Sequence, residues 1–182
     1  GTSIMAITRV SASNLSGTSL PSTITTASGL SLGKVLQVVQ TIDKNQGSFS
    51  LATDTISTMM TVNITPSSTS SKILVRFDAY FGNQSTPAHP YVILRRDGSD
   101  IYRANTAGSR KNSTGYTGNM GNENLQCLSN EFLDSPSSTS QLAYTLNVAG
   151  FASRTFYKNI PDVNSAATCT ACSSITVMEL AT

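Results

Sequence analysis

The sequence predicts an all-β domain, built as an antiparallel sandwich or barrel, and three observations lead to this prediction. Serine and threonine account for 52 of the 182 residues and asparagine for 13, which suits strands joined by hydroxyl-rich turns. Several segments alternate apolar and polar residues with the period of two that half-buried strands show. No segment has the run of Ala, Leu, Glu and Lys that a long helix needs.

The first three predicted strands follow one another from Gly33 onward. Strand 34–42 is rich in valine and apolar on both faces, and strand 55–66 alternates until it stops at Pro66. A hydroxyl-rich turn, "SSTSS", then leads into strand 72–81 and reverses the chain without needing charge. This third strand has the clearest alternation of the chain, with one apolar face made of Ile73, Val75, Phe77, Ala79 and Phe81.

The next segment predicts a hairpin followed by a long loop. Residues 91–103 read as two strands around Asp97-Gly98, a pair that supplies the positive φ of a tight turn. Residues 104–124 are rich in Gly, Asn and Ser, and loops of this length are often functional. Further strands bring the total to about nine or ten and are predicted at 125–136, 141–151, 153–160 and 173–180.

The length of the chain fits one well-buried domain, 33–182, preceded by a different segment, 1–32. That first segment is small, polar and nearly uncharged, so alone it cannot bury enough surface to fold. Two interpretations stay open for it. It is either a flexible Ser/Thr linker or an extended shaft whose spaced apolar residues meet their copies on sister chains, which requires an oligomer.

Charge and cysteine content narrow the classes of partner. The net charge is +2 with scattered Lys and Arg, so we expect no nucleic-acid partner. No apolar run reaches transmembrane length and no signal peptide is recognisable, so we expect no membrane insertion. Cys127, Cys169 and Cys172 make an odd count, a poor basis for a disulfide framework. Assembly in a reducing cytoplasm therefore fits at least as well as secretion.

The residues that could carry catalysis have simpler explanations. Asp97 and Asp100 flank the predicted hairpin beside the solvated pair Arg95-Arg96, and Asp134 precedes Ser-Pro as a turn former. A glycosidase needs two carboxylates across a sugar, and the chain has only ten acids. The single histidine, His89, stands between two prolines, and no Gly-x-Ser-x-Gly motif is present. We therefore expect no enzymatic activity.

Metal and cofactor sites are equally weak. Cys169 and Cys172 have the spacing of metal ligands, and Cys127 with His89 would formally complete four zinc ligands. A lone C-x₂-C is a weak signal, and a local disulfide or free thiols are the alternatives. No phosphate-binding loop and no calcium loop is present. We expect neither a metal nor a cofactor.

Recognition of a carbohydrate is the better prospect. Sugars bind against aromatic faces, with Asn, Asp and Arg reading the hydroxyls, and two groups of such side chains stand in or beside the loops 104–124 and 82–90. The alternative is that tyrosines at strand ends are core residues with solvated hydroxyls, which applies least to the tyrosine in the middle of the long loop. The candidate binding residues are Tyr102, Arg103, Arg110, Lys111, Asn112, Tyr116, Asn83, His89 and Tyr91.

Four blocks in order, "GKVLQVVQT", "ITPSSTSSKILVRFDAYF", "FLDSPSSTSQLAYTLNV" and "SSITVMEL", resemble the C-terminal knob domains of bacteriophage and marine-virus (cyanophage-type) tail fibres. Such knobs are similar to the jelly roll of tumour necrosis factor and of complement globular heads. The resemblance implies a TNF-like antiparallel jelly-roll sandwich that assembles as a homotrimer. It also implies that residues 1–32 are the end of a fibre shaft.

In such a trimer the first and last strands would turn apolar surface towards the threefold axis. The candidate interface residues are Val35, Val39, Ile175, Val177 and Met178. The sequence alone leaves a second explanation open, because strands that are apolar on both faces could be central in a monomeric sandwich.

The resemblance implies a virion protein, extracellular after release, whose knob attaches the phage to the host bacterial surface. The expected partners are the chain itself, a host cell-surface glycan or outer-membrane receptor, and other virion proteins through the shaft. One alternative is a purely structural protein, such as a head fibre or trimerisation cap. Another is a small polysaccharide-degrading tip, which would release reducing ends from host polysaccharide.

Overall fold

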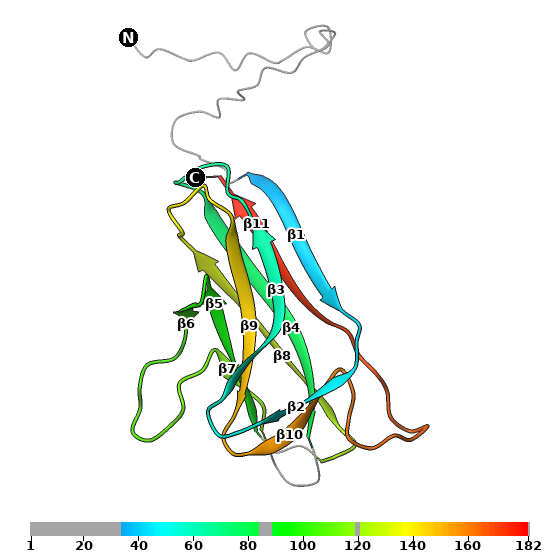
Figure 1. Cartoon of the computed structure of the whole chain (residues 1–182). Coiled ribbons are helices and arrows are strands. Elements are labelled where there is room, and N and C mark those ends of the chain that lie inside the picture. Colours follow the sequence, from blue (N-terminus) through cyan, green and yellow to red (C-terminus); the bar gives the residue numbers. More distant parts are fainter. Residues whose placement is uncertain (1–33, 84–88, 119–120, 182) are drawn as a thin grey trace, which may run out of the picture. The chain divides into compact units, whose positions relative to one another are not determined.

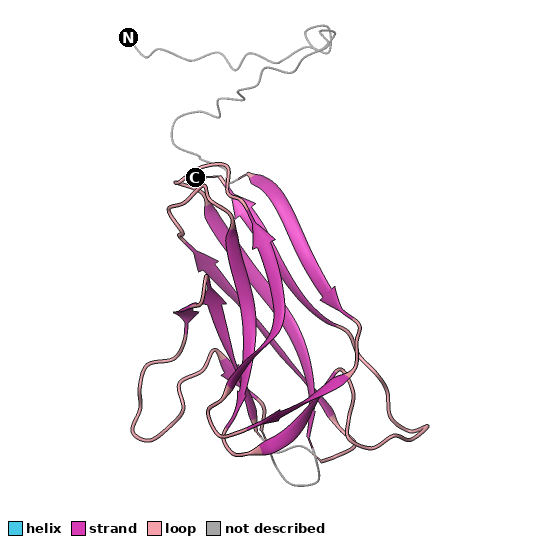
Figure 2. Ribbon diagram, viewed as in Figure 1, coloured by secondary structure: helices cyan, strands magenta, loops and turns pink. Residues whose placement is uncertain are grey.

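The computed structural model describes residues 34–83, 89–118 and 121–181, and in them it shows eleven strands and no helix (Figures 1 and 2). The segment 1–32, predicted as a shaft end or linker, lies outside the described residues. The strands are β1 (Val35–Asp43), β2 (Gly47–Leu51), β3 (Ile56–Ile64), β4 (Lys72–Asn83), β5 (Pro90–Arg96), β6 (Ser99–Tyr102), β7 (Gly115–Tyr116), β8 (Leu125–Asp134), β9 (Leu142–Gly150), β10 (Arg154–Lys158) and β11 (Ser173–Leu180).

The strands form two antiparallel sheets with jelly-roll order. In sheet A, β4 pairs with β8 along one edge and with β11 and then β10 along the other. The strand β1 in turn pairs with β11, and β2 pairs with β10. In sheet B the order is β3-β9-β5, and β6 and β7 both pair with β5. Numbered along the chain without the short β2, β7 and β10, the strands follow the orders 1-8-3-6 and 2-7-4-5. This confirms the predicted antiparallel jelly-roll sandwich.

The core lies between the sheets and is built by period-2 alternation. The predicted apolar face of β4 is buried throughout, from Ile73 to Phe81. It faces the side chains of β9 that point inward, Tyr144, Leu146 and Val148, which are all fully buried. Each side chain of this size contributes roughly 1.5–3 kcal/mol by leaving water. Alternation alone therefore identified the main core residues.

The structure corrects the faces assigned to the first and last strands. Ile175 and Val177 are fully buried in the core, and Val39 packs against it. These three predicted interface residues point between the sheets, so they do not face a neighbouring subunit. The strand β1 is apolar on both faces, yet it is not a central strand. It lies at the edge of sheet A and pairs only with β11 among the described strands.

The "SSTSS" turn connects one sheet to the other and is held by a buried carboxylate. Glu179 of β11 is 0% exposed and accepts hydrogen bonds from the Ser67 backbone N–H at 2.7 Å, the Ser67 and Ser71 hydroxyls at 2.7 and 2.6 Å, and Gln37 Nε2 at 2.6 Å. Burial alone would raise the pKa of Glu179, but the hydrogen bonds from Ser67, Ser71 and Gln37 outweigh it and lower the pKa to about 2. The expectation that this turn needs no charge is therefore wrong.

The second hydroxyl-rich connection, from β8 to β9, also has a carboxylate at its base. Asp134 accepts hydrogen bonds from Arg96 Nη1 at 2.5 Å, from Tyr144 Oη at 2.7 Å and from the Ser135 backbone N–H at 2.8 Å. The bond to Ser135 confirms its turn-forming role. Arg96, predicted to be solvated, instead points inward to this carboxylate, whose side chain is only 9% exposed.

The predicted Asp97-Gly98 hairpin is confirmed, with φ angles of 50° and 81° at its two central residues. The two ends of the sandwich differ in what they hold. At one end β1 begins and β11 ends, tied by the Ala181 N–H to the Lys34 carbonyl at 2.8 Å, and both hydroxyl-rich connections lie there (Figure 1). At the opposite end β4 and β9 finish and β5 begins, and we call this the distal end.

Candidate functional site

The long loop predicted at 104–124 is largely an excursion from one sheet edge. Since β6 and β7 both pair with β5, the chain leaves that edge at residue 103 and returns to it at 114. The base is closed by the Ala104 N–H to the Ser113 carbonyl at 3.0 Å and by the Thr114 N–H to the Val92 carbonyl at 2.8 Å. The Thr114 hydroxyl also donates to the Tyr102 carbonyl. The excursion is therefore anchored firmly to sheet B.

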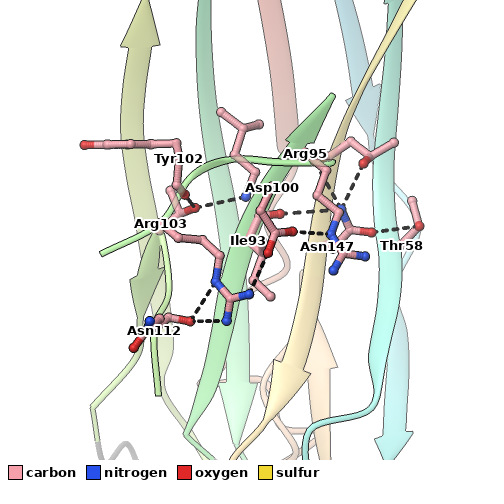
Figure 3. Close-up of polar contacts among 11 residues, drawn as sticks. Thr58, Ile93, Arg95, Asp100, Tyr102, Arg103, Asn112 and Asn147 are labelled. Atoms are coloured by element: carbon pink, nitrogen blue, oxygen red, sulfur yellow. Dashed lines mark hydrogen bonds and ion pairs between the residues drawn. The ribbon is translucent and has the colours of Figure 1, made fainter. Parts of the chain in front are cut away.

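A polar network on the outer face of sheet B supports the same base (Figure 3). Asp100 lies between two guanidinium groups, with Arg95 Nε at 2.6 Å and Arg103 Nη1 at 2.6 Å. Arg103 Nη2 also donates to the Asn112 carbonyl at 2.7 Å. Burial alone would raise the pKa of Asp100, but the hydrogen bonds from Arg103 and Arg95 outweigh it and lower this pKa below 3.8.

This network assigns several predicted binding residues to structural roles. Arg103 holds the loop base, and the Asn112 side chain donates to Thr106 Oγ1 within the loop at 2.9 Å. Arg110 closes a turn onto the Ala107 carbonyl. Each of them therefore shapes the loop, although Arg103 and Arg110 are exposed residues and only Asn112 is half-buried.

Two of the predicted tyrosines point away from solvent. Tyr102 stacks on Phe132 with ring centroids 4.8 Å apart, packs against the core and donates weakly to Asn130 Oδ1 at 3.4 Å. Tyr91 is only 3% exposed. Both fit the alternative that tyrosines at strand ends are buried packing residues, although their hydroxyls bond to Asp54 and Asn130 where solvent was expected. Tyr102 is therefore removed from the candidate site, while Tyr91 forms the floor of the patch described next.

Four aromatic side chains meet at the distal end of sheet B, and we call them the distal aromatic patch. Phe151 is its centre, with ring centroids 5.2 Å from Tyr91, 6.2 Å from His89 and 6.3 Å from Tyr116. The Tyr116 and Phe151 rings are nearly perpendicular, at 88°. Tyr116 is 60% exposed and Phe151 36% exposed. The patch thus offers two solvent-facing rings held in place by a buried one.

An ion pair borders this patch. Asp54, between β2 and β3, accepts a hydrogen bond from Tyr91 Oη at 3.1 Å and pairs with Lys111 Nζ at 2.5 Å. The hydrogen bond from Lys111 is the main reason why the pKa of Asp54 lies below 3.8, with burial opposing it and Tyr91 adding to it. Burial and the bond to Asp54 in turn raise the pKa of Tyr91 above 10. The ion pair thus joins the loop excursion, which leaves the sheet beside β5, to the connection before β3 at the other edge of sheet B.

The structure brings together four of the predicted residues, His89 and Tyr91 from one segment and Lys111 and Tyr116 from another. Sequence reasoning missed Phe151 and Asp54. The signal for Phe151 was an aromatic residue directly after Gly150, where the alternation of β9 ends. Asp54 gave no signal beyond its place in a short polar connection. The side chain of Asn83, a further predicted residue, lies outside the described part of the structure.

The outer face of sheet A carries a second distinctive surface, a row of four apolar side chains that crosses four strands. The row follows the strand register from β1 through β11 and β4 to β8, and it consists of Val38, Met178, Leu74 and Leu133. Val38 is 56% exposed and Leu133 51% exposed, while the two in the middle are half-buried. We call these four residues the outer apolar row.

The surroundings of this row are mixed. The neighbouring row towards the distal end is polar, made of Gln40, Thr176, Arg76 and Glu131. On the other side the irregularity of β1 at Leu36 leaves Val35 49% exposed and Leu36 39% exposed. Of the predicted interface residues, Val35 and Met178 therefore do lie on the outside. In β1 the side chains of Leu36 and Val38 are exposed, whereas Val39, the predicted interface residue, packs against the core.

The remaining candidates from the sequence give no further site. Cys127, Cys169 and Cys172 are free and exposed. Among the described residues, no three His, Cys, Asp or Glu side chains cluster closely enough to hold a metal ion. The same residues include no helix with the length and apolarity required to cross a bilayer.

No protein-family model and no curated protein sequence matches the chain. A search of solved structures finds similarity to a chain in a structure of the Gx strain of infectious bursal disease virus, with a TM-score of 0.43 and 12% sequence identity. The match covers 79% of this chain and 40% of the viral chain. This chain therefore spans well under half the length of that protein.

Proposed function

We propose that the chain is a non-enzymatic virion fibre protein whose trimeric knob attaches a bacteriophage to the host cell surface by binding a glycan. The observation that carries the proposal is the distal aromatic patch. Its exposed rings, bordered by an ion pair, lie at the end of the sandwich opposite Lys34 and Ala181. A fibre that enters the knob at Lys34 would present this end to the cell.

The remaining support comes from the sequence and the fold. Four ordered sequence blocks resemble fibre knobs, and the strand order is that of a jelly roll. Recognition sites for small ligands combine apolar or aromatic surface with a few polar groups, and the distal end provides both. Three copies on one rigid knob would raise the effective concentration of weak sites without new contacts.

The occupant proposed for the outer apolar row is two further copies of the same chain. The row crosses four of the six strands of sheet A and would otherwise remain in water. Burial of half-exposed valine and leucine side chains against a neighbour stabilises association at roughly 25 cal/mol per Å². Light scattering is expected to give about three times the 19.2 kDa chain mass. A monomer at micromolar concentration would contradict the trimer.

Attachment is tested with the labelled full chain on a panel of bacterial species that includes the host. Saturable binding, reduced by an excess of unlabelled protein, is expected for at least one species. In the test variant a two-residue Asn-Gly turn replaces residues 105–112, because the Ala104–Ser113 bond already closes the excursion. Loss of binding by a variant of unchanged mass supports attachment through the distal loops. Unchanged binding by the variant would contradict attachment through the loop excursion, and no binding by the wild type favours a purely structural cap.

A further inference from the structure

The distal aromatic patch has the shape of a stacking site. Tyr116 and Phe151 expose their rings at nearly a right angle, and Tyr91 beneath Phe151 is almost fully buried. Phe151 follows β9 directly and Tyr116 belongs to β7, both of which border β5 in the same sheet. Their positions are thus fixed by strand pairing, although both residues remain partly exposed, Tyr116 more than Phe151. Neighbouring exposed apolar side chains on a rigid frame are typical of ligand-binding surfaces.

The polar groups beside the rings complement hydroxyl groups. Asp54 offers carboxylate oxygens as acceptors and Lys111 offers ammonium protons as donors, and their side chains are 46% and 38% exposed. A carboxylate and an ammonium group side by side can bind two neighbouring hydroxyls, one as donor and one as acceptor, through charge-assisted hydrogen bonds. The Tyr91 hydroxyl already donates to Asp54 and so keeps the carboxylate oriented.

Charge balance selects the class of ligand. The positive charge of Lys111 is matched by the carboxylate of Asp54, so this pair carries no net positive charge that would favour a carboxylate, sulfate or phosphate group. A pyranose has one face of C–H groups that can lie on an aromatic ring and a rim of hydroxyls that can reach the ion pair. A neutral sugar therefore fits both halves of the site.

Backbone strain marks the same place. Of the five described non-glycine residues with positive φ, two lie here: Asp54, which borders the patch, has φ 61°, and His89, which belongs to it, has φ 42°. A backbone in this region costs free energy, and it persists where the surrounding contacts fix it, often at ligand sites. Asp54 is fixed by its N–H to the Gly150 carbonyl at 3.1 Å and by its two side-chain partners.

We propose that Tyr116 and Phe151, together with Asp54 and Lys111, form a subsite for one neutral pyranose residue of a glycan. This proposal rests on the proposed attachment function and specifies its site and its class of sugar. Stacking occurs on the exposed rings, and the Asp54–Lys111 pair binds two hydroxyls of the same residue.

The test is ligand-observed saturation-transfer NMR on the full chain. The probes are the methyl glycosides of glucose, galactose, mannose and N-acetylglucosamine, with glucuronic acid as the acidic comparison. At least one neutral probe is expected to bind. Tyr116→Ala, at an exposed edge position, is expected to weaken binding about tenfold or more, and Asp54→Asn similarly. Arg154→Ala, at an exposed residue outside the patch, is the matched control and leaves binding unchanged.

Phe151→Ala removes the ring that covers Tyr91, so the folding of this variant is checked by circular dichroism. Phe151→Leu serves as a second variant that keeps the apolar volume without the ring.

Wild-type protein that binds only glucuronic acid, or no probe, overturns the proposal, as does unchanged binding by Tyr116→Ala. The same variants are tested for cell attachment. If the Tyr116→Ala chain attaches normally while the loop-replacement variant does not, the subsite is wrong and the attachment function stands. If the wild type fails to attach to any species, the attachment function itself fails.

Discussion

At the scale of single residues, the connections between the sheets depend on two acidic side chains. Glu179 is fully buried and forms no ion pair with any described residue, and hydrogen bonds from Gln37, Ser67 and Ser71 stabilise its charge. Such a carboxylate stays ionised because the donors stabilise the charged form more than burial destabilises it. The hydroxyl-rich turn therefore has a specific partner, and its serines are not interchangeable turn residues.

This arrangement predicts how stability changes with acid. The folded-state pKa of Glu179 is about 2, below the ordinary 4.5, so its contribution is fully present above about pH 4.5 and is lost as pH falls towards 2. Glu179→Gln is expected to lower the free energy of unfolding at pH 7 by about 2–4 kcal/mol, because the NH2 group that replaces one carboxylate oxygen cannot accept hydrogen bonds from the buried donors. It should also flatten the acid limb of the stability curve between pH 4.5 and 2. Urea unfolding across this range measures both effects.

The control for this prediction is Glu131→Gln, at an exposed position on the outer face of β8. It should change the free energy of unfolding by no more than about 0.5 kcal/mol. A Glu179→Gln variant with the same acid limb as the wild type would show that this carboxylate does not govern acid sensitivity.

A second residue is constrained by backbone contact. Gly82 lies in β4 where that strand pairs with both β8 and β10, and an added Cβ would lie 2.4 Å from the Ile160 carbonyl oxygen and 2.8 Å from Pro161 Cα. Gly82→Ala is therefore expected to cost about 1–3 kcal/mol or more, because backbone must move. Thermal unfolding measures the loss. Gly115→Ala, whose Cβ would meet only Val92 Cγ2 at 3.9 Å, is the control and should be near neutral.

At the scale of elements, β11 shows how one strand serves two surfaces. Ile175, Val177 and Glu179 face the core and are fully buried, whereas Met178 lies in the outer apolar row. Neighbours in sequence therefore have opposite roles, because a strand alternates its faces with every residue. The prediction from the sequence that Ile175 and Val177 lie at a subunit interface is wrong for this reason.

Substitutions along this strand should separate the two roles. Ile175→Ala is expected to lower the free energy of unfolding by about 2–5 kcal/mol, because it leaves a cavity in the core. Met178→Ala should leave the stability of a dissociated chain within about 1 kcal/mol of the wild type and instead weaken association. Chemical unfolding at low protein concentration and sedimentation at high concentration measure the two effects. Equal loss of stability in both variants under dilute conditions would contradict the assignment.

At the scale of the whole molecule, the two outer faces of the sandwich have different characters. Sheet A presents the outer apolar row, while sheet B is covered by the loop excursion with its Asp100 network and ion pair. The hydroxyl-rich connections lie at one end and the distal aromatic patch at the other. This division suits a protein that associates sideways and binds a ligand at its end.

Association through the row predicts stability that depends on concentration. Because only folded chains associate, Tm should rise by about 2–4 °C for each tenfold increase in protein concentration. Val38→Glu and Leu133→Glu should abolish this dependence by placing charges in the contact, with the fold retained because both positions are half-exposed. Tyr116→Ala, an exposed apolar residue on the other sheet, is the control and should keep it. Calorimetry over a hundredfold concentration range measures the effect.

The sequence by itself determined the class of fold, the position of most strands and the Asp97-Gly98 turn. These features depend on local signals, namely alternation along β4 and β9 and the positive φ that a tight turn needs. The two-residue strand β7 and the short β2 were not predicted, because each exists only through its pairing partner, β5 or β10.

Only the tertiary structure decided which apolar face of β1 and β11 points outward, and which residues form the candidate site. Val39 and Val38 are equally apolar in sequence, and the partner sheet alone determines which one is buried. Tyr91, Tyr116 and Phe151 come from three separate segments, and strand pairing brings them together. Asp54 and Glu179 acquire their roles from partners 57 and 112 residues away. Long-range contacts of this kind leave no periodic signal in the sequence, so the site had to be found in the folded chain.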